Sequence, residues 1–167
     1  MSEVPLVRIE RLRAEELGPY LDRLIPEYAE DHARDGRWTL EEANGRARSE
    51  VEGLLPQGID TPDHYLFAIR AGAEDVGRIW FARKHEAGGP PFAFVYDLLV
   101  YPQYRRRGYA ETAMRALEPK VRDLGLERLA LHVFGNNRAA IRLYERLGYA
   151  TTNVLMAKTV SADPRRA

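Results

Sequence analysis

The spacing of apolar residues changes along the chain and separates the expected strands from the expected helices. Apolar and polar residues alternate over 7–12, which predicts a first strand. The runs 65–70, 75–84 and 92–101 are rich in branched and aromatic residues and predict three more strands. The last of these runs is almost continuously apolar, as is typical of a strand buried on both faces.

Two helices are expected between the first and second strands. The segment 14–34 has helical spacing, but Pro19 and Pro26 should interrupt it, because a proline inside a helix removes a hydrogen bond and clashes with the preceding turn. The second helix should begin after Thr39, whose side chain can cap it, with Glu42 as the partner in a capping box.

The second half of the chain has a clearer helical pattern. Apolar residues form a stripe from Ala110 to Leu124, and Gly125 is placed to end this helix. Pro119 lies inside the stripe and should kink or loosen the helix.

A further strand and helix follow this stripe. The alternating segment 128–134 predicts a strand, and Asn136 or Asn137 can cap a helix that Gly148 closes. The segment 149–160 is expected to form two closing strands.

The expected order of elements is β-α-α-β-β-β-α-β-α-β-β. This order predicts an α/β fold in which helices flank a mixed central β-sheet. A length of 167 residues fits one domain. We expect that domain to span 1–160 and the tail 161–167 to be disordered.

The composition excludes several classes of protein. There is no cysteine, which rules out disulfides, a thiol nucleophile and cysteine metal sites, and no His, Asp or Glu cluster has metal-ligand spacing. The formal net charge is +0, so a nucleic-acid or membrane partner is not expected. The chain shows neither a signal peptide nor an apolar run of membrane length, so we expect a cytoplasmic protein.

The charge is unevenly distributed. The segment 27–63 has ten acidic and four basic residues, a net charge of −6, whereas 101–122 has six basic and two acidic residues, a net charge of +4. Two interpretations are open. The segments are ordinary solvated helix faces, or a basic site for an anion faces an acidic site for a cation.

Three arginines precede the helix that starts near Ala110. Arg105, Arg106 and Arg107 stand directly before Gly108, where the helix dipole is already positive. A solvated basic loop is one interpretation. The other is a phosphate site, in which free backbone N–H groups and arginines bind an anion that the small Gly108 lets approach. Neither a P-loop nor a Rossmann fingerprint occurs in the chain.

This turn resembles motif A of the GCN5-related N-acetyltransferase (GNAT) superfamily. The matching residues are Val100, Pro102, Arg105, Gly108 and Ala110. The segment 136–149 is similar to motif B of the same family. The residues that match motif B are Asn137, Ala140, Leu143, Tyr144, Gly148 and Tyr149. The resemblance covers about residues 60 to 160, and the first 60 residues match only in their order of elements.

The resemblance implies a GNAT-like fold, acetyl-CoA as cosubstrate without a metal, and an amine acceptor. Backbone groups of Leu98, Leu99 and Val100 would hold the pantetheine and the acetyl carbonyl. Asn137 would touch the pantetheine arm, and Tyr144 would donate a proton to the departing thiolate. The residues implied at the pyrophosphate are Arg105, Arg106, Arg107, Gly108, Tyr109, Ala110 and Glu111.

The catalytic roles have structural alternatives. Asp97 lies on the long apolar run and could take the proton of the acceptor ammonium, or it could pair with an arginine or cap a bulge. Tyr144 could be a core aromatic residue on a helical stripe. His132 follows the alternation of its strand, which favours a structural role.

The leading hypothesis for function is an N-acetyltransferase. Its acceptor would be a cationic primary amine, on a small molecule or on a protein, and a homodimer is left open. A non-catalytic acyl-CoA-binding or regulatory domain on the same fold is the alternative, and a nucleic-acid binder that uses the arginines is a third.

Overall fold

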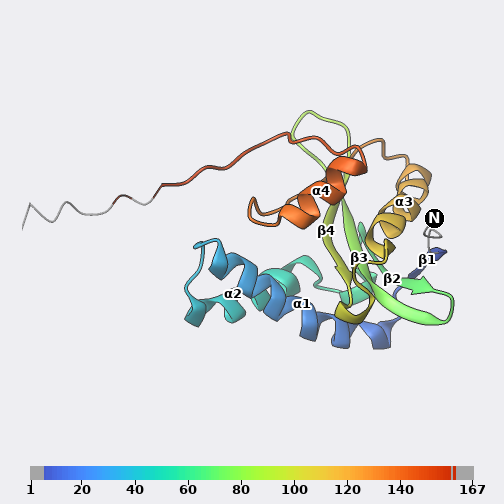
Figure 1. The fold of residues 1–167 in the computed structure, drawn as a ribbon, viewed down its shortest axis with the longest axis horizontal. Coiled ribbons are helices and arrows are strands. Elements are labelled where there is room, and N and C mark those ends of the chain that lie inside the picture. Colours follow the sequence, from blue (N-terminus) through green and yellow to red (C-terminus); the bar gives the residue numbers. More distant parts are fainter. Residues whose placement is uncertain (1–5, 159, 161–167) are drawn as a thin grey trace, which may run out of the picture.

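The computed structural model of the chain describes residues 6–158 and 160 and shows a five-stranded sheet between two layers of helices (Figure 1). The elements are β1 (Val7–Arg11), α1 (Ala14–Arg34), α2 (Leu40–Leu54), η1 (Gly58–Asp60), β2 (His64–Ala71), β3 (Glu74–Lys84), β4 (Phe92–Val100), η2 (Pro102–Tyr104), α3 (Tyr109–Asp123), β5 (Leu129–Leu131) and α4 (Arg138–Arg146). The strands lie in the order β1-β2-β3-β4-β5. The first four are antiparallel and β5 is parallel to β4, so the predicted α/β fold with a mixed sheet is confirmed.

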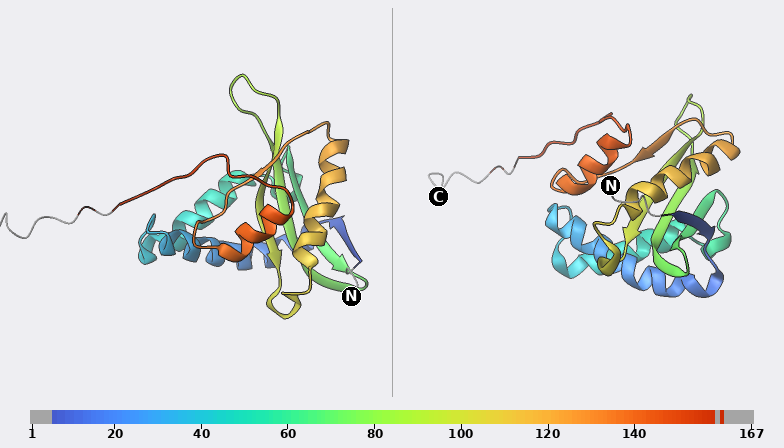
Figure 2. Two further views of the ribbon diagram at one scale, coloured as in Figure 1. Left: turned by 45° about the horizontal axis from the view of Figure 1, so that its top comes forward. Right: turned by 45° about the vertical axis from the view of Figure 1, so that its right-hand side comes forward.

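Each face of the sheet is covered by a different pair of helices (Figure 2). On one face α1 and α2 bury side chains such as Leu24 and Ala47 against Trp80 of β3. On the other face α3 buries Met114 and Leu117 against the sheet, and α4 leans on the same core through partly buried residues. Burial of these apolar stripes is the main stabilising contribution to such a layered fold.

A bulge interrupts the pairing of β3 with β4. Trp80 pairs with Asp97 and Phe81 pairs with Val95, so Tyr96 has no partner in the register. An extra residue in one strand bends that strand and changes which face its side chains point to. β5 pairs only with the segment 93–95 of β4, so the two strands are no longer paired past the bulge.

Pro19 and Pro26 do not interrupt their helix, so that part of the prediction was wrong. Helix α1 runs continuously through Pro19 and Pro26, and α3 runs through Pro119. In α1 both proline side chains are exposed, so the carbonyls that lose a partner face water. Burial of neighbours such as Tyr20 and Ile25 outweighs the local loss.

The strand expected at 128–134 is shorter than predicted. Only Leu129–Leu131 is extended and paired, because β4 turns away after Val95 and leaves later residues without a strand to pair with. A strand depends on its neighbour for its backbone hydrogen bonds, so the alternating pattern alone could not extend it.

The two closing strands are not formed in the described part of 149–160. Residues 150–158 and 160 have no strand pairing, and Leu155 and Met156 are 80% and 87% exposed. This segment leaves the body of the molecule, as Figure 1 shows in red. The alternation predicted strands, but no sheet edge pairs with the segment. The tail predicted at 161–167 lies outside the described residues.

Candidate active site

The turn between β4 and α3 has the geometry of an anion site. Arg106 and Gly108 both have positive φ, 63° and 80°, so the backbone folds back on itself twice before the helix begins. The first intrahelical bond runs from the N–H of Thr112 to the carbonyl of Gly108, at 3.1 Å. The N–H groups of 109–111 precede this bond and have no partner within the helix. Such a nest of N–H groups fits a pyrophosphate.

The arginines of this turn are exposed and carry charge that no carboxylate neutralises within the described residues. Arg105 donates from Nε to the carbonyl of Val100 at 3.0 Å, and the Arg107 guanidinium lies 6.0 Å from the centre of the Tyr104 ring. The Arg105 bond fixes the end of β4 to the turn, but it uses one lone pair of the carbonyl that was expected to meet the pantetheine. Beyond Val95, β4 has no strand beside it on the β5 side in the described chain.

Asp97 lies just after the bulge and faces α1. Its Oδ2 accepts a hydrogen bond of 2.7 Å from the Tyr20 hydroxyl, so its partner is a phenol rather than an arginine. Burial raises the pKa of the Asp97 carboxyl from 3.8 to about 6, and the negative charges of Glu27 and Asp31 on α1 add to the rise against the hydrogen bond from Tyr20. A carboxylate of this kind changes protonation close to neutral pH, as a general base does.

Tyr20 was not identified from the sequence. The expected interruption at Pro19 left the next residue without a predicted place, and only the continuous helix brings its hydroxyl to Asp97. No sequence motif could have signalled the pair, because the two residues are 77 positions apart.

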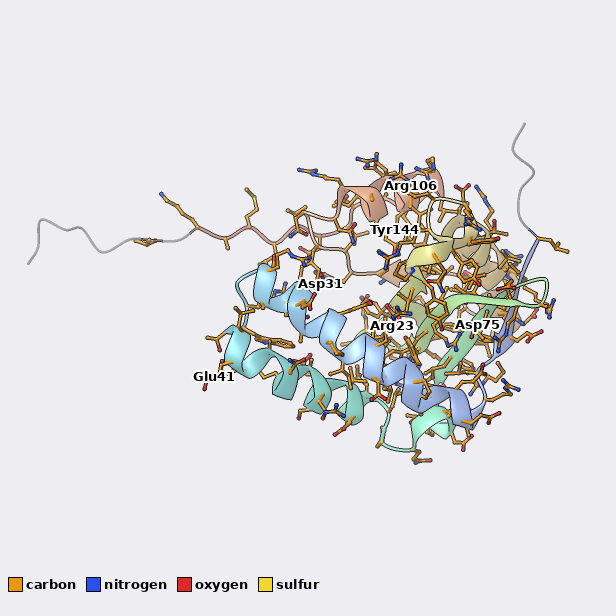
Figure 3. The ribbon with its side chains drawn as sticks, turned by 60° about the horizontal axis from the view of Figure 1, so that its bottom comes forward. Arg23, Asp31, Glu41, Asp75, Arg106 and Tyr144 are labelled. Atoms are coloured by element: carbon orange, nitrogen blue, oxygen red, sulfur yellow. The ribbon has the colours of Figure 1, made fainter. Side chains whose placement is uncertain are left out.

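Tyr144 lies on α4 and is partly buried against the core on the other face of the sheet. Burial raises the pKa of its hydroxyl from 10.0 to about 12, and the charge of Asp97 contributes to the rise, which requires the two groups to lie near each other. The hydroxyl has no hydrogen-bond partner among the described residues, while the ring packs 5.6 Å from that of Tyr149. Figure 3 labels Tyr144 together with Asp31, which lies on α1.

Asn137 is the N-cap of α4, as one of the two predicted choices. Its Oδ1 accepts a hydrogen bond of 3.1 Å from the N–H of Ala140, and Asn136 makes no such cap. The side-chain NH₂ group of Asn137 is not used in this cap. It therefore remains available to a ligand that approaches the start of α4.

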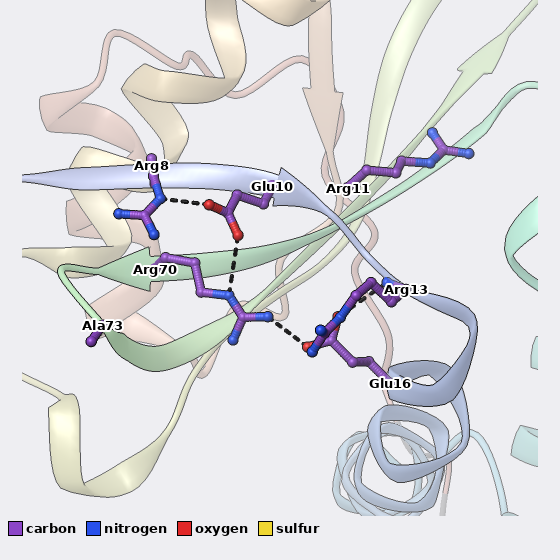
Figure 4. Close-up of a pocket in the computed structure, with 7 residues that line it drawn as sticks. All are labelled: Arg8, Glu10, Arg11, Arg13, Glu16, Arg70 and Ala73. Atoms are coloured by element: carbon purple, nitrogen blue, oxygen red, sulfur yellow. Dashed lines mark hydrogen bonds and ion pairs between the residues drawn. The ribbon is translucent and has the colours of Figure 1, made fainter.

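A recess lies beside β1 and the start of α1. It encloses about 310 Å³ and is drawn in Figure 4. Arg70 donates to Glu16 at 2.6 Å, and Arg13 donates to the other carboxylate oxygen at 3.2 Å. Burial would raise the pKa of Glu16, but these hydrogen bonds outweigh it and lower the pKa to about 2. Arg8 pairs with Glu10, and Arg13 and Arg70 pair with Glu16, so these ion pairs link β1, α1 and β2.

No group of three or more potential ligand side chains is arranged to hold a metal ion within 6–158 and residue 160. In the same stretch no helix has the length and apolar character needed to cross a membrane.

Comparison with known proteins shows that the chain is similar to acetyltransferases. A family model described as the acetyltransferase (GNAT) family matches residues 20–149. A Bacillus subtilis (strain 168) protein, the uncharacterized N-acetyltransferase YycN, is 35% identical over 153 residues, which are 91% of this chain and 97% of that protein. A second protein of that strain, the uncharacterized N-acetyltransferase YdgE, is 33% identical over 90% of this chain and 96% of its own length. The crystal structure of YycN, a putative acetyltransferase, has a TM-score of 0.88 and 34% identity over 94% of this chain and all of that chain.

Proposed function

Because the chain belongs to the acetyltransferase (GNAT) family, we propose that it moves the acetyl group of acetyl-CoA to a primary amine, with Asp97 as the base and Tyr144 as the general acid. The observation that carries this proposal is the pair of pKa values of two groups, one of which is affected by the charge of the other. The pKa of Asp97 is raised to about 6, while that of Tyr144 is raised to about 12. At pH 7 one group is free to accept a proton and the other still holds one.

Acetyl-CoA supplies an acetyl group already activated as a thioester. The N–H groups of 109–111 and the three arginines bind its pyrophosphate, and the unpaired side of β4 beyond Val95 accommodates the pantetheine arm. Binding at these groups orients the thioester toward Asp97 of β4 and Tyr144 of α4.

The proton transfers follow from the two side chains. Asp97 takes a proton from the acceptor ammonium, directly or through water, which frees the nitrogen lone pair to attack the thioester carbonyl. As the carbon–sulfur bond breaks, Tyr144 donates its proton to the departing thiolate, and the second proton that the nitrogen loses as the amide forms restores the Tyr144 hydroxyl. The high pKa of Tyr144 keeps that proton in place throughout the neutral range.

The acceptor is proposed to be cationic. Glu27 and Asp31 are exposed on α1, and their negative charges contribute to the raised pKa of Asp97. Each also meets an arginine of the same helix, at 3.7 Å and 3.1 Å, in exposed ion pairs of the kind that contribute little. The remaining negative field attracts a small cationic amine or a protein amine.

The activity should depend on the protonation of Asp97. Since the base must be ionised, kcat/KM should rise with pH through about 6 and then level off, whereas an unperturbed carboxyl would place this rise near pH 4. Asp97→Asn should lower kcat/KM about 100-fold and remove the rise. Initial rates between pH 5 and 9 measure both, and an unchanged acid limb in the variant would assign the rise to another group.

The raised pKa of Asp97 should also make the folding stability of the protein depend on pH. Its pKa is higher in the folded chain than the usual 3.8, so its stabilising contribution is complete below pH 3.8 and is lost as the pH rises through about 6. Asp97→Asn should therefore leave the Tm unchanged or raised at pH 8. A thermal melt at pH 8 checks this, and it separates loss of catalysis from loss of fold.

The charge of the acceptor should control the rate at low salt. A cationic amine should react faster than a neutral or acidic amine of similar size, and salt should reduce the advantage by screening the field. Rates with matched amines at about 10 mM and 500 mM salt test this, since the screening length falls from roughly 30 Å to a few ångström. Equal rates for the two amines would remove the proposed role of Glu27 and Asp31.

The overall proposal is tested by turnover. Purified protein, acetyl-CoA and a panel of primary amines should release free thiol in proportion to acetylated amine. Binding of acetyl-CoA without turnover across the panel would favour the non-catalytic acyl-CoA-binding domain instead.

A further inference from the structure

Four aromatic rings connect the N-terminal helices with the segment that leads into α4. We call Tyr28, His32, Trp38 and Phe134 the aromatic bridge. His32 stacks on Trp38 with ring centres 4.1 Å apart, and Tyr28 meets His32 edge-on at 4.4 Å. Phe134 meets His32 edge-on at 5.4 Å. The first three rings belong to α1 and its connection to α2, whereas Phe134 belongs to the connection between β5 and α4.

The α1 side of the bridge is firmly held. His32 is only 8% exposed, and the Tyr28 hydroxyl donates to Glu50 of α2 at 2.9 Å. The Arg37 guanidinium lies 5.8 Å from the centre of the Phe134 ring, a cation–π contact from the same side. Phe134 therefore rests on a preformed surface made by the two N-terminal helices.

Helix α4 has few other supports. None of its nine residues is buried, although Tyr144 is partly buried against the core, as is Leu147 just after the helix. Arg146 pairs with Glu111 at 3.6 Å, an exposed contact near the end of the helix. All of these contacts hold the C-terminal half of α4.

The aromatic bridge supports the N-terminal end of α4 through Phe134. The carbonyl of Phe134 accepts the N–H of Asn137 at 2.9 Å, and Asn137 caps the first turn of α4. Phe134 and the helix cap thus form one short turn. Tyr144 lies seven residues beyond the cap, about 10 Å along the helix. A small rotation at the cap would therefore displace its hydroxyl.

We propose that Phe134 is a positioning residue, which acts through α4 to hold the Tyr144 hydroxyl opposite Asp97. This inference rests on the proposed function of Tyr144 as the general acid. It assigns a catalytic consequence to a side chain that has no part in either sequence motif.

Phe134→Leu removes the ring but keeps an apolar side chain. We expect kcat to fall about 10-fold, since displacing a reacting group by a fraction of an ångström has effects of this order or larger. The Kd of acetyl-CoA should change less than about 3-fold, because the aromatic and cation–π contacts of the pyrophosphate turn involve none of the four rings of the bridge. Phe134→Tyr retains the ring and should restore kcat. Phe92→Leu, at the start of β4 and away from the bulge, is the control and should keep kcat.

A double-mutant cycle distinguishes positioning from a general loss of stability. If Phe134 acts through Tyr144, adding Phe134→Leu to Tyr144→Phe should lower kcat no further. A further 10-fold loss in the double variant would overturn the inference, and so would an unchanged kcat in Phe134→Leu alone. If Tyr144→Phe by itself leaves the chemical rate unchanged, the general-acid assignment fails, and the inference fails with it.

Trp38→Leu provides the second variant should Phe134→Leu fold poorly. It removes the ring that supports His32 from the other side of the bridge, so it should lower kcat in the wild-type background and not in Tyr144→Phe. Loss of kcat in both backgrounds would contradict the inference.

Discussion

Gly108→Val is expected to weaken acetyl-CoA binding about 100-fold or more. Gly108 has φ of 80°, a conformation that a β-branched residue adopts only with strain, and it immediately precedes the free N–H groups of 109–111. A change of this backbone angle would turn those groups away from the pyrophosphate. Two lost hydrogen bonds to a charged group amount to about 3 kcal/mol, which corresponds to the expected factor.

Gly125→Val is the matched control for this variant. Gly125 has φ of 72° and stands just past the other end of α3, where an added Cβ would meet no atom within 4 Å. Both variants should therefore lose similar stability, roughly 1–3 kcal/mol. Calorimetric titration with CoA and thermal melts measure the two effects separately. Equal affinity for CoA in the two variants would show that the turn does not bind the pyrophosphate.

Tyr144→Phe should lower kcat about 100-fold while the Kd of acetyl-CoA stays unchanged. The variant keeps the ring that packs against Tyr149 and removes only a hydroxyl that makes no hydrogen bond within the described structure, so the fold has no reason to weaken. Single-turnover kinetics should be used, because slow product release could hide a loss in the chemical step.

Tyr149→Phe tests whether the effect is specific to one hydroxyl. Burial raises the pKa of Tyr149 as it does that of Tyr144, and the two rings are neighbours, but the charge of Asp97 does not contribute at Tyr149. We expect Tyr149→Phe to retain nearly full kcat. Similar losses in both variants would point to packing of α4 rather than to proton donation.

The local signals in the sequence predicted most of the elements because each has a local cause. Thr39 accepts the N–H of Glu42 as the predicted cap of α2, and the positive φ of Gly125 ends α3 where expected. The buried stripe of α3 contains the predicted residues, among them Met114 and Leu117. Caps and stripes depend on residues a few positions apart, so the sequence displays them directly.

The arginine turn was also visible before the structure. The three arginines before Gly108 predicted an anion site, and the structure adds a second residue with positive φ, Arg106, and a row of free N–H groups. The roles of Asp97 and Tyr144 remain proposals. The resemblance to the family named Tyr144, and the place of Asp97 on the long apolar run suggested that residue as the base. In the structure the charge of Asp97 contributes to the raised pKa of Tyr144.

Tertiary contacts decided the features that local patterns predicted wrongly or omitted. Pro19 and Pro26 remain inside α1 because burial of the helix against the sheet outweighs two lost hydrogen bonds. The bulge at Tyr96 turns Asp97 toward Tyr20, and nothing in the run of apolar residues indicates where the pairing with β3 slips.

By itself the sequence determined the class of fold, the helix caps, the basic turn and the family, since each is encoded within a few neighbouring residues or one short motif. Only the tertiary structure decided the length of β5, the unpaired state of 150–158, the environment that raises the pKa of Asp97, and the aromatic contact between His32 and Phe134. The physical reason is that strand pairing, burial and electrostatic fields depend on residues distant in the chain, and their outcome is set by how the layers pack.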